Sequence, residues 1–178
     1  MSEFRIALRP ALGSAVKPAP RGVAMTAMPE GHVVQVLGSP QGPDLSKMLL
    51  GKNAGASPHA VRSAGPGQWF IVGDTPLSHS EFTTIATGLK PHAAAVDQSH
   101  GRVRIRLEGA MVERTLAKGT AVDLDLRMFP VGNSTTTLLG HISVHLTRVD
   151  VAAFEIMVLR GFAESLWENL VRMNVEFA

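Results

Sequence analysis

A strand–helix–strand–helix order that occurs twice is the feature that most restricts the fold of this chain. The segment 31–38 is apolar between glycines, and the segment 101–109 alternates arginines with aliphatic residues at the period of two that is typical of a strand. Each is followed by a predicted helix and by a second apolar strand, at 68–73 in the first half and at 154–159 in the second. We therefore expect an α+β fold of two similar halves, each with an antiparallel or mixed sheet that helices cover on one face.

Several boundaries within these halves are predicted from local signals. Ser78-His79-Ser80-Glu81 has the spacing of a capping box, in which a Ser and a Glu side chain bind free backbone amides at the start of a helix. A C-terminal helix is expected over 162–172, because apolar residues recur there at every fourth position. We also predict a short helix at 43–51, a loop at 52–66 and one long strand at 138–149.

The first residues are expected to form an arm outside the two halves. Residues 1–22 are punctuated by Pro and Gly and show no hydrophobic period, so we place the halves at 23–95 and 96–178. Apolar residues alternate at the start of the arm and could add a strand to the sheet edge of a partner protein; an unpaired terminus is the alternative. These residues are Phe4, Ile6 and Leu8.

Composition excludes several classes of protein. The chain of 178 residues contains no cysteine, which rules out disulfides, zinc–thiolate sites, iron–sulfur sites and a cysteine nucleophile. Its formal net charge of +2 and its aromatic content of 5% do not favour nucleic-acid binding, which uses basic surfaces and stacking aromatics. No segment approaches the ~20 apolar residues of a membrane span, and residues 1–30 lack the apolar core of a signal peptide. We expect a cytoplasmic protein that binds neither nucleic acid nor membrane.

Motifs for catalysis, cofactors or metals are not found. Gly65-Pro66-Gly67 precedes a strand and not a helix, so it does not fit a phosphate-binding loop. His141 and His145 would lie on one strand about 13 Å apart, at ~3.3 Å per residue, too far to share a metal ion. Asp97 and Ser99 share a face, which favours a hydrogen bond at the entry of a strand over catalysis. We therefore expect no catalytic, cofactor-binding or metal-binding residue in this chain.

Three arginines form a stripe on the strand predicted at 101–109. Arg102, Arg104 and Arg106 share one face of that strand, opposite its aliphatic residues. Adjacent guanidinium groups repel each other unless a counter-charge lies close. The stripe is therefore expected either on a solvated outer face with acidic neighbours, or next to a phosphate ligand or an acidic protein surface. We count these arginines, with the apolar residues of the arm, as candidate partner contacts.

Several sequence blocks, taken in order, resemble known families. Val96-Asp97-Gln98-Ser99-His100-Gly101 resembles the D-x-S-H signature of the folate-binding aminomethyltransferase superfamily, which includes the glycine-cleavage T-protein. Four further blocks resemble the gamma subunits of heterotetrameric sarcosine oxidases, and the resemblance runs from around residue 30 to the C-terminus. These blocks are Gly65-Pro66-Gly67-Gln68-Trp69-Phe70-Ile71-Val72, Phe129-Pro130-Val131-Gly132, Thr137-Leu138-Leu139-Gly140-His141 and Arg160-Gly161-Phe162-Ala163-Glu164-Ser165-Leu166-Trp167. The resemblance implies the fold of an aminomethyltransferase folate-binding domain.

The resemblance also implies a subunit that works inside a redox complex. Sarcosine oxidases of this type oxidise sarcosine to glycine and carry FAD, FMN, NAD, zinc and tetrahydrofolate, which are expected on the other subunits. The implied partners are the alpha, beta and delta subunits, chiefly the large alpha chain. T-proteins have Asp residues on the strand that corresponds to 140–144, whereas this chain has Gly-His-Ile-Ser-Val there. A non-catalytic gamma subunit is therefore expected.

Two alternatives stay open at this point. The first is the equivalent subunit of a related N-methyl amino acid dehydrogenase, for example one that acts on N-methylglutamate. The second is a free-standing folate-binding protein.

Overall fold

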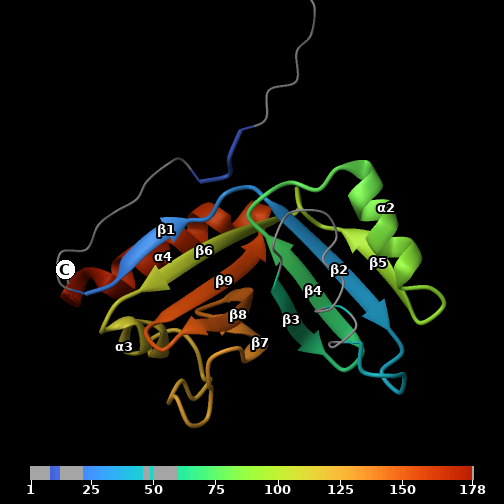
Figure 1. Cartoon of the computed structure of the whole chain (residues 1–178). Coiled ribbons are helices and arrows are strands. Elements are labelled where there is room, and N and C mark those ends of the chain that lie inside the picture. Colours follow the sequence, from blue (N-terminus) through green and yellow to red (C-terminus); the bar gives the residue numbers. More distant parts are fainter. Residues whose placement is uncertain (1–8, 13–21, 46–48, 50–59, 178) are drawn as a thin grey trace, which may run out of the picture.

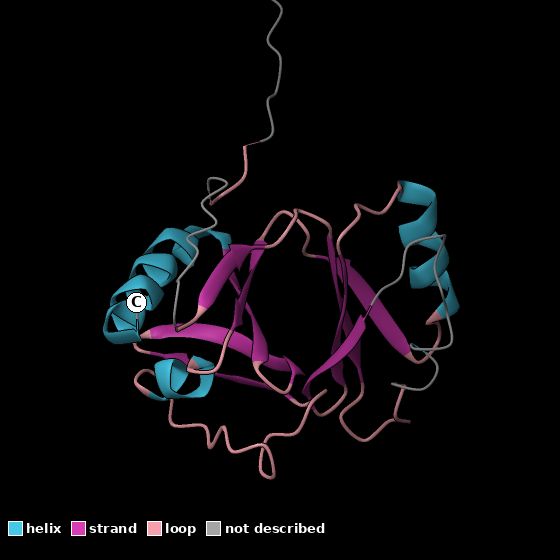
Figure 2. Cartoon of the chain, turned by 60° about the vertical axis from the view of Figure 1, so that its left-hand side comes forward, coloured by secondary structure: helices cyan, strands magenta, loops and turns pink. Residues whose placement is uncertain are grey.

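The computed structural model describes residues 9–12, 22–45, 49 and 60–177 of the chain. These residues form two antiparallel sheets that face each other, with the helices on the outer sides of the pair (Figure 1; Figure 2). The predicted α+β fold, in which helices cover one face of each sheet, is confirmed.

Among the described residues, the C-terminal sheet has five strands and the N-terminal sheet has four. The C-terminal sheet has the order β1 (Ala24–Ala27), β6 (Arg102–Glu108), β9 (Ala153–Leu159), β8 (Ile142–Asp150) and β7 (Ser134–Leu139). The N-terminal sheet has the order β3 (Ala60–Gly65), β4 (Gln68–Gly73), β2 (His32–Gly38) and β5 (Ala93–Asp97). All neighbouring strands in both sheets are antiparallel.

The two sheets share the same central arrangement. In the N-terminal sheet β4 lies between β2 and β3, and in the C-terminal sheet β9 lies between β6 and β8. The outer neighbour of β2 is β5, whereas the outer neighbour of β6 is β1, which comes from much earlier in the chain. The expected boundary between residues 95 and 96 falls inside β5, and the division into two halves stays a prediction.

One helix begins where a local sequence signal places it. At α2 (His79–Gly88), Ser78 Oγ accepts a hydrogen bond from the Glu81 amide at 3.3 Å, and the Glu81 carboxylate accepts one from the Ser78 amide at 2.7 Å. The predicted capping box is therefore confirmed. Further helices among the described residues are α3 (Val112–Ala117), α4 (Ala163–Asn174) and the short 3₁₀ helices η1 (Arg160–Phe162) and η2 (Val175–Phe177).

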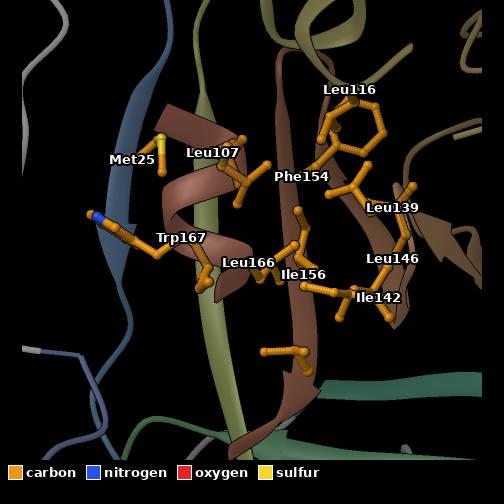
Figure 3. Packing of buried hydrophobic residues seen from close by; sticks show 14 of the residues in the cluster. Met25, Leu107, Leu116, Leu139, Ile142, Leu146, Phe154, Ile156, Leu166 and Trp167 are labelled. Atoms are coloured by element: carbon orange, nitrogen blue, oxygen red, sulfur yellow. The ribbon is translucent and has the colours of Figure 1, made fainter. Parts of the chain in front are cut away.

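The main hydrophobic core lies between the C-terminal sheet and helices α3 and α4 (Figure 3). Alternate residues of β6 and β9 point into it, among them Ile105 and Ile156, which are 0% exposed, and Leu166 of α4 packs over them. A smaller core lies between α2 and the N-terminal sheet, around Val34 and Ile71. Because these two cores lie on the helix side of each sheet, the other face of each sheet is turned towards the other sheet.

Two predicted elements differ from the structure. The loop expected at 52–66 is wrong over its last part, because Ala60–Gly65 forms β3 and pairs with β4. The single strand expected at 138–149 is wrong, because Gly140 and His141 form a two-residue turn between β7 and β8. Gly140 has a φ of +63°, and no other residue of this turn has a positive φ. A positive φ at the first central position is the geometry of a type II′ hairpin turn, where glycine is favoured.

Several predictions fall on residues outside the described ranges. Phe4, Ile6 and Leu8 lie there, as does most of the arm over 1–22. Within the described part of the arm, Leu12 packs into the main core. The helix predicted at 43–51 is also mostly outside the described residues, although the Leu49 amide donates to the Leu45 carbonyl at 2.8 Å, as in an α-helix.

Candidate functional site

The arginine stripe of β6 lies between the two sheets. Its aliphatic face packs on the helices, so Arg102, Arg104 and Arg106 are turned towards the N-terminal sheet. The antiparallel register sets Arg106 opposite Glu155 of β9. Arg104 is only 5% exposed, so the expectation of a solvated outer face is wrong for this residue. The alternating pattern separates the two faces of a strand but does not say which of them a second sheet will cover.

Glu155 is the centre of a buried ion network. Its carboxylate lies 3.1 Å from Arg62 of β3 and 3.6 Å from Arg104 of β6, and so connects the two sheets. Arg104 also lies 2.5 Å from Asp74 and donates to the carbonyl of Gly73 at 3.0 Å. Two guanidinium groups are thus balanced by two carboxylates, as buried charges require.

Burial also determines the electrostatics of Arg62. It lowers the pKa of this side chain, the adjacent Glu155 carboxylate opposes that shift, and the nearby Arg104 adds to it. Arginine keeps its charge in proteins even so. The network therefore holds permanent cations, and its stability depends on the carboxylates that neutralise them.

A cleft of about 540 Å³ opens beside the ion network. Its lining includes Arg62, Arg104 and Glu155, and also Arg106, whose Nε donates to Glu108 at 2.8 Å. Arg148 lines it too and pairs with Glu113 at 2.7 Å. Each arginine in this lining therefore has a carboxylate partner within the chain. An incoming anion would have to compete with these ion pairs.

A second pocket of about 230 Å³ is lined by the residue at the other end of the stripe, Arg102. The guanidinium of Arg102 lies over the ring of Phe70, 4.8 Å from its centroid, and the His145 ring meets the same ring edge-on at 5.2 Å. His145 Nε2 donates to the carbonyl of Ser63 at 2.8 Å, which ties β8 to β3. Burial lowers the pKa of His145, the bond to Ser63 opposes this, and the charges of Arg62 and Arg102 add to it. His145 is therefore a neutral imidazole near pH 7.

Asp97 and Ser99 have the structural role that their spacing predicts. Ser99 Oγ donates to the Asp97 carboxylate at 2.5 Å and accepts from the Val33 amide at 3.1 Å, which fastens the end of β5 to β2. His141 lies in the turn before β8, and not on one strand with His145, which corrects the expected spacing.

Neither a metal cluster nor a membrane-spanning helix occurs among the described residues. In the part of the chain that the structure describes, no group of three or more His, Cys, Asp or Glu side chains is placed to hold a metal ion. Among these same residues, no helix has the length and apolar character needed to cross a membrane.

Tetrahydrofolate, which the resemblance implies for the whole complex, does not fit the residues of this site. The side chains that β8 contributes to the two pockets between the sheets include Ser143, His145 and Thr147, and none of these is a carboxylate. The carboxylates of Asp74 and Glu155 in the cleft are both held by arginines. No step of folate chemistry is therefore assigned to this chain.

Sequence reasoning missed the acidic half of the ion network. Glu155 stands alone in the apolar strand 154–159, and such a carboxylate is seldom buried without a cation close by. That signal could have predicted a partner for the arginine stripe. Arg62 carried no comparable signal, because it lies in the segment that was expected to be a loop.

Comparison with known proteins gives a family and two similar structures. Residues 54–176 match the model of the family described as sarcosine oxidase, gamma subunit family. The chain is similar to a chain of the heterotetrameric sarcosine oxidase from Corynebacterium sp. U-96 in complex with pyrrole 2-carboxylate, with 21% identity and a TM-score of 0.75 over 92% of this chain and 89% of that chain. It is also similar to the glycine cleavage system aminomethyltransferase T from Bartonella henselae, with 14% identity and a TM-score of 0.60 over 86% of this chain and 46% of that chain. A search of curated protein sequences gives no match.

The two structural similarities show a common fold, and they confirm the predicted likeness to aminomethyltransferase domains. The family match is more specific, because it extends over residues 54–176 and so includes strands of both sheets and helix α4. It agrees with the order of the sequence blocks from Gly65 to Trp167. The chain therefore belongs to the sarcosine oxidase gamma subunit family.

Proposed function

We propose that this chain is the gamma subunit of a heterotetrameric sarcosine oxidase and that it contributes to assembly and not to catalysis. The observation that carries the proposal is the match of residues 54–176 to the gamma subunit family. Its partners are the alpha, beta and delta subunits, chiefly the large alpha chain, and its location is cytoplasmic.

The chemistry between the sheets supports a structural role. Arg62 and Arg104 share the carboxylate of Glu155, and Arg104 also binds Asp74. Because these charges satisfy each other, loss of one of them would weaken the contact between the sheets. In this proposal FAD, FMN, NAD, zinc and tetrahydrofolate are bound by the other subunits, and sarcosine is oxidised to glycine there.

The fold favours one alternative of a different class. Its similarity to an aminomethyltransferase, with a TM-score of 0.60, is the observation behind a free-standing folate-binding protein. Calorimetric titration of the isolated chain with tetrahydrofolate separates the two functions, since only the alternative expects binding without partner subunits.

Co-expression with the other three subunits tests the proposal. We expect this chain to co-purify with them in a fixed ratio, and we expect the isolated chain to form no hydrogen peroxide from sarcosine. A chain that stays apart from the other subunits would contradict the role in assembly. Turnover of sarcosine by the isolated chain would contradict the non-catalytic role.

The substrate of the assembled enzyme requires a separate measurement. A related N-methyl amino acid dehydrogenase would contain an equivalent subunit, so the complex should be assayed with sarcosine and with N-methylglutamate. We expect preference for sarcosine, and a preference for N-methylglutamate would assign the chain to the related enzyme.

A further inference from the structure

Arg102 differs from the other two arginines of the stripe in its surroundings. Arg104 and Arg106 form ion pairs with Asp74 and Glu108. Among the described residues, Arg102 has no ion-pair partner, and its buried Nε has no hydrogen-bond acceptor. Burial lowers the pKa of Arg102, and no neighbouring carboxylate opposes that shift. The part of the chain that the structure describes therefore supplies no counter-charge to this partly buried cation.

The pocket around Arg102 is lined by both polar and apolar residues. Its lining includes Gln35, Gln68 and Ser143, whose side chains can hydrogen-bond an anion. Leu159 lies directly opposite Arg102 in the register and is 46% exposed. Leu138 of β7 lies opposite Ser143 of β8 and is 55% exposed, so it adds to the exposed apolar surface at Leu159.

The guanidinium of Arg102 is already oriented. It lies 4.8 Å from the centroid of the Phe70 ring, and Phe70 is held in turn by the edge of His145. A cation fixed over an aromatic ring loses little conformational freedom when it binds a carboxylate. Buried arginines and aromatic residues also dominate the binding energy of protein interfaces.

The size of the pocket separates two classes of occupant. Sites for cofactors and other small molecules usually have volumes of about 300–1,000 Å³. The pocket at Arg102 has about 230 Å³, which is below that range. A single side chain projecting from a protein surface matches this volume better, and the exposed leucines at the edge would then be covered by apolar neighbours of that side chain.

We infer that this pocket receives an Asp or Glu side chain of a partner subunit, which pairs with Arg102 while apolar residues beside it cover Leu159 and Leu138. The inference rests on the proposed function, because it names the contact by which the gamma subunit docks. It also reduces the candidate partner contacts of the stripe to Arg102, which forms no ion pair with any described residue.

Substitution of Arg102 in the co-expressed complex tests the inference. For Arg102→Met we expect affinity for the other subunits to fall about 30-fold or more, since truncating one member of a buried charge pair has effects of that order. Arg106→Met is the matched control, because Arg106 lies on the same face of the same strand but pairs with Glu108. That control should change the affinity by less than about 5-fold, as for an exposed ion pair.

A second pair of variants keeps Arg102 in place. Leu159→Glu puts a carboxylate directly across from Arg102 and supplies the missing counter-charge from within the chain. We expect this variant to fold at least as stably as the native chain and to assemble at least 10-fold more weakly. Leu159→Gln controls for the loss of apolar surface, and it should weaken assembly less than Leu159→Glu does.

The outcomes separate this inference from the proposed function. Failure of the native chain to assemble with the other subunits would overturn the proposed function and the inference with it. If the native chain assembles, and either Arg102→Met or Leu159→Glu binds the other subunits as tightly as the native chain does, the inference alone is overturned. Stabilisation of the isolated chain by acetate or inorganic phosphate, lost in Arg102→Met while assembly is unchanged, would show a small-anion site and would also overturn it.

Discussion

Replacement of Glu155 by Gln tests how strongly the ion network holds the two sheets together. Gln keeps the shape of the side chain but removes the negative charge that Arg62 and Arg104 share at 3.1 and 3.6 Å. Arg104 keeps its contact with Asp74, whereas Arg62, which is 8% exposed, loses its ion-pair partner. Removal of one member of a buried ion pair costs about 3–5 kcal/mol. In a chain of this size that loss lowers Tm by roughly 6–20 °C.

Equilibrium unfolding in urea, followed by tryptophan fluorescence, measures the effect. Trp69 lies in the smaller core and Trp167 in the main core, so the signal reports on both sheets. Glu108→Gln is the matched control, because Glu108 pairs with Arg106 where the two side chains are 49% and 38% exposed. That variant should lose no more than about 1 kcal/mol.

An apolar triple variant separates the loss of charge from the loss of packing. When Arg62→Met, Arg104→Met and Glu155→Leu are combined, no buried charge is left unpaired, and the free energy of unfolding should stay within about 1–2 kcal/mol of the native value or exceed it. A Glu155→Gln variant as stable as Glu108→Gln would refute the reasoning, because it would mean that water reaches Arg62 in the folded chain.

Three further predictions concern other parts of the molecule. Arg148, which is 0% exposed, donates to the carbonyls of Leu124 and Val151, so Arg148→Met should lower the free energy of unfolding in urea by about 3 kcal/mol, at ~1–3 kcal/mol for each carbonyl that loses its donor. Ser78→Ala removes the side-chain acceptor at the start of α2 and should cost about 1 kcal/mol in the same assay; an unchanged midpoint would show that the cap contributes nothing. Burial lowers the pKa of His145, so the unfolded chain takes up a proton at a higher pH than the folded chain does. The native free energy of unfolding should therefore decrease as the pH falls below about 6.5, and His145→Gln should reduce this dependence; an identical pH profile for the variant would contradict the assignment.

Much of the fold could be predicted because the strands have informative patterns. The alternation over 101–109 predicts both the strand β6 and its two faces, and the capping box predicts the start of α2. The strand β3 could not be recognised in this way. Its sequence Ala-Val-Arg-Ser-Ala-Gly has few β-branched residues, and it forms a strand because it pairs with β4.

The site was predictable only in part, for a related reason. The sequence shows that Arg102, Arg104 and Arg106 share a face, but the environment of Arg104 depends on Glu155, which lies on another strand and also pairs with Arg62. Charge pairs between strands distant in the sequence are set by how the sheets meet. Local spacing carries no information on that contact, so the difference between Arg104, which forms ion pairs, and Arg102, which forms none with the described residues, became visible only in three dimensions.

The placement of β1 has a consequence for any attempt to divide the molecule. Met25 on β1 and Val23 just before it are 2% and 0% exposed, within a core otherwise built largely from residues after 100. A fragment that begins after this strand would leave the backbone of β6 as an open edge, ready to pair with other molecules and aggregate. An N-terminal fragment that keeps β1 but lacks the rest of the C-terminal sheet would expose the apolar side chains of Val23 and Met25. Because β1 comes before the N-terminal sheet in the chain but belongs to the C-terminal sheet, neither sheet with its helices should be obtained in soluble form without the other.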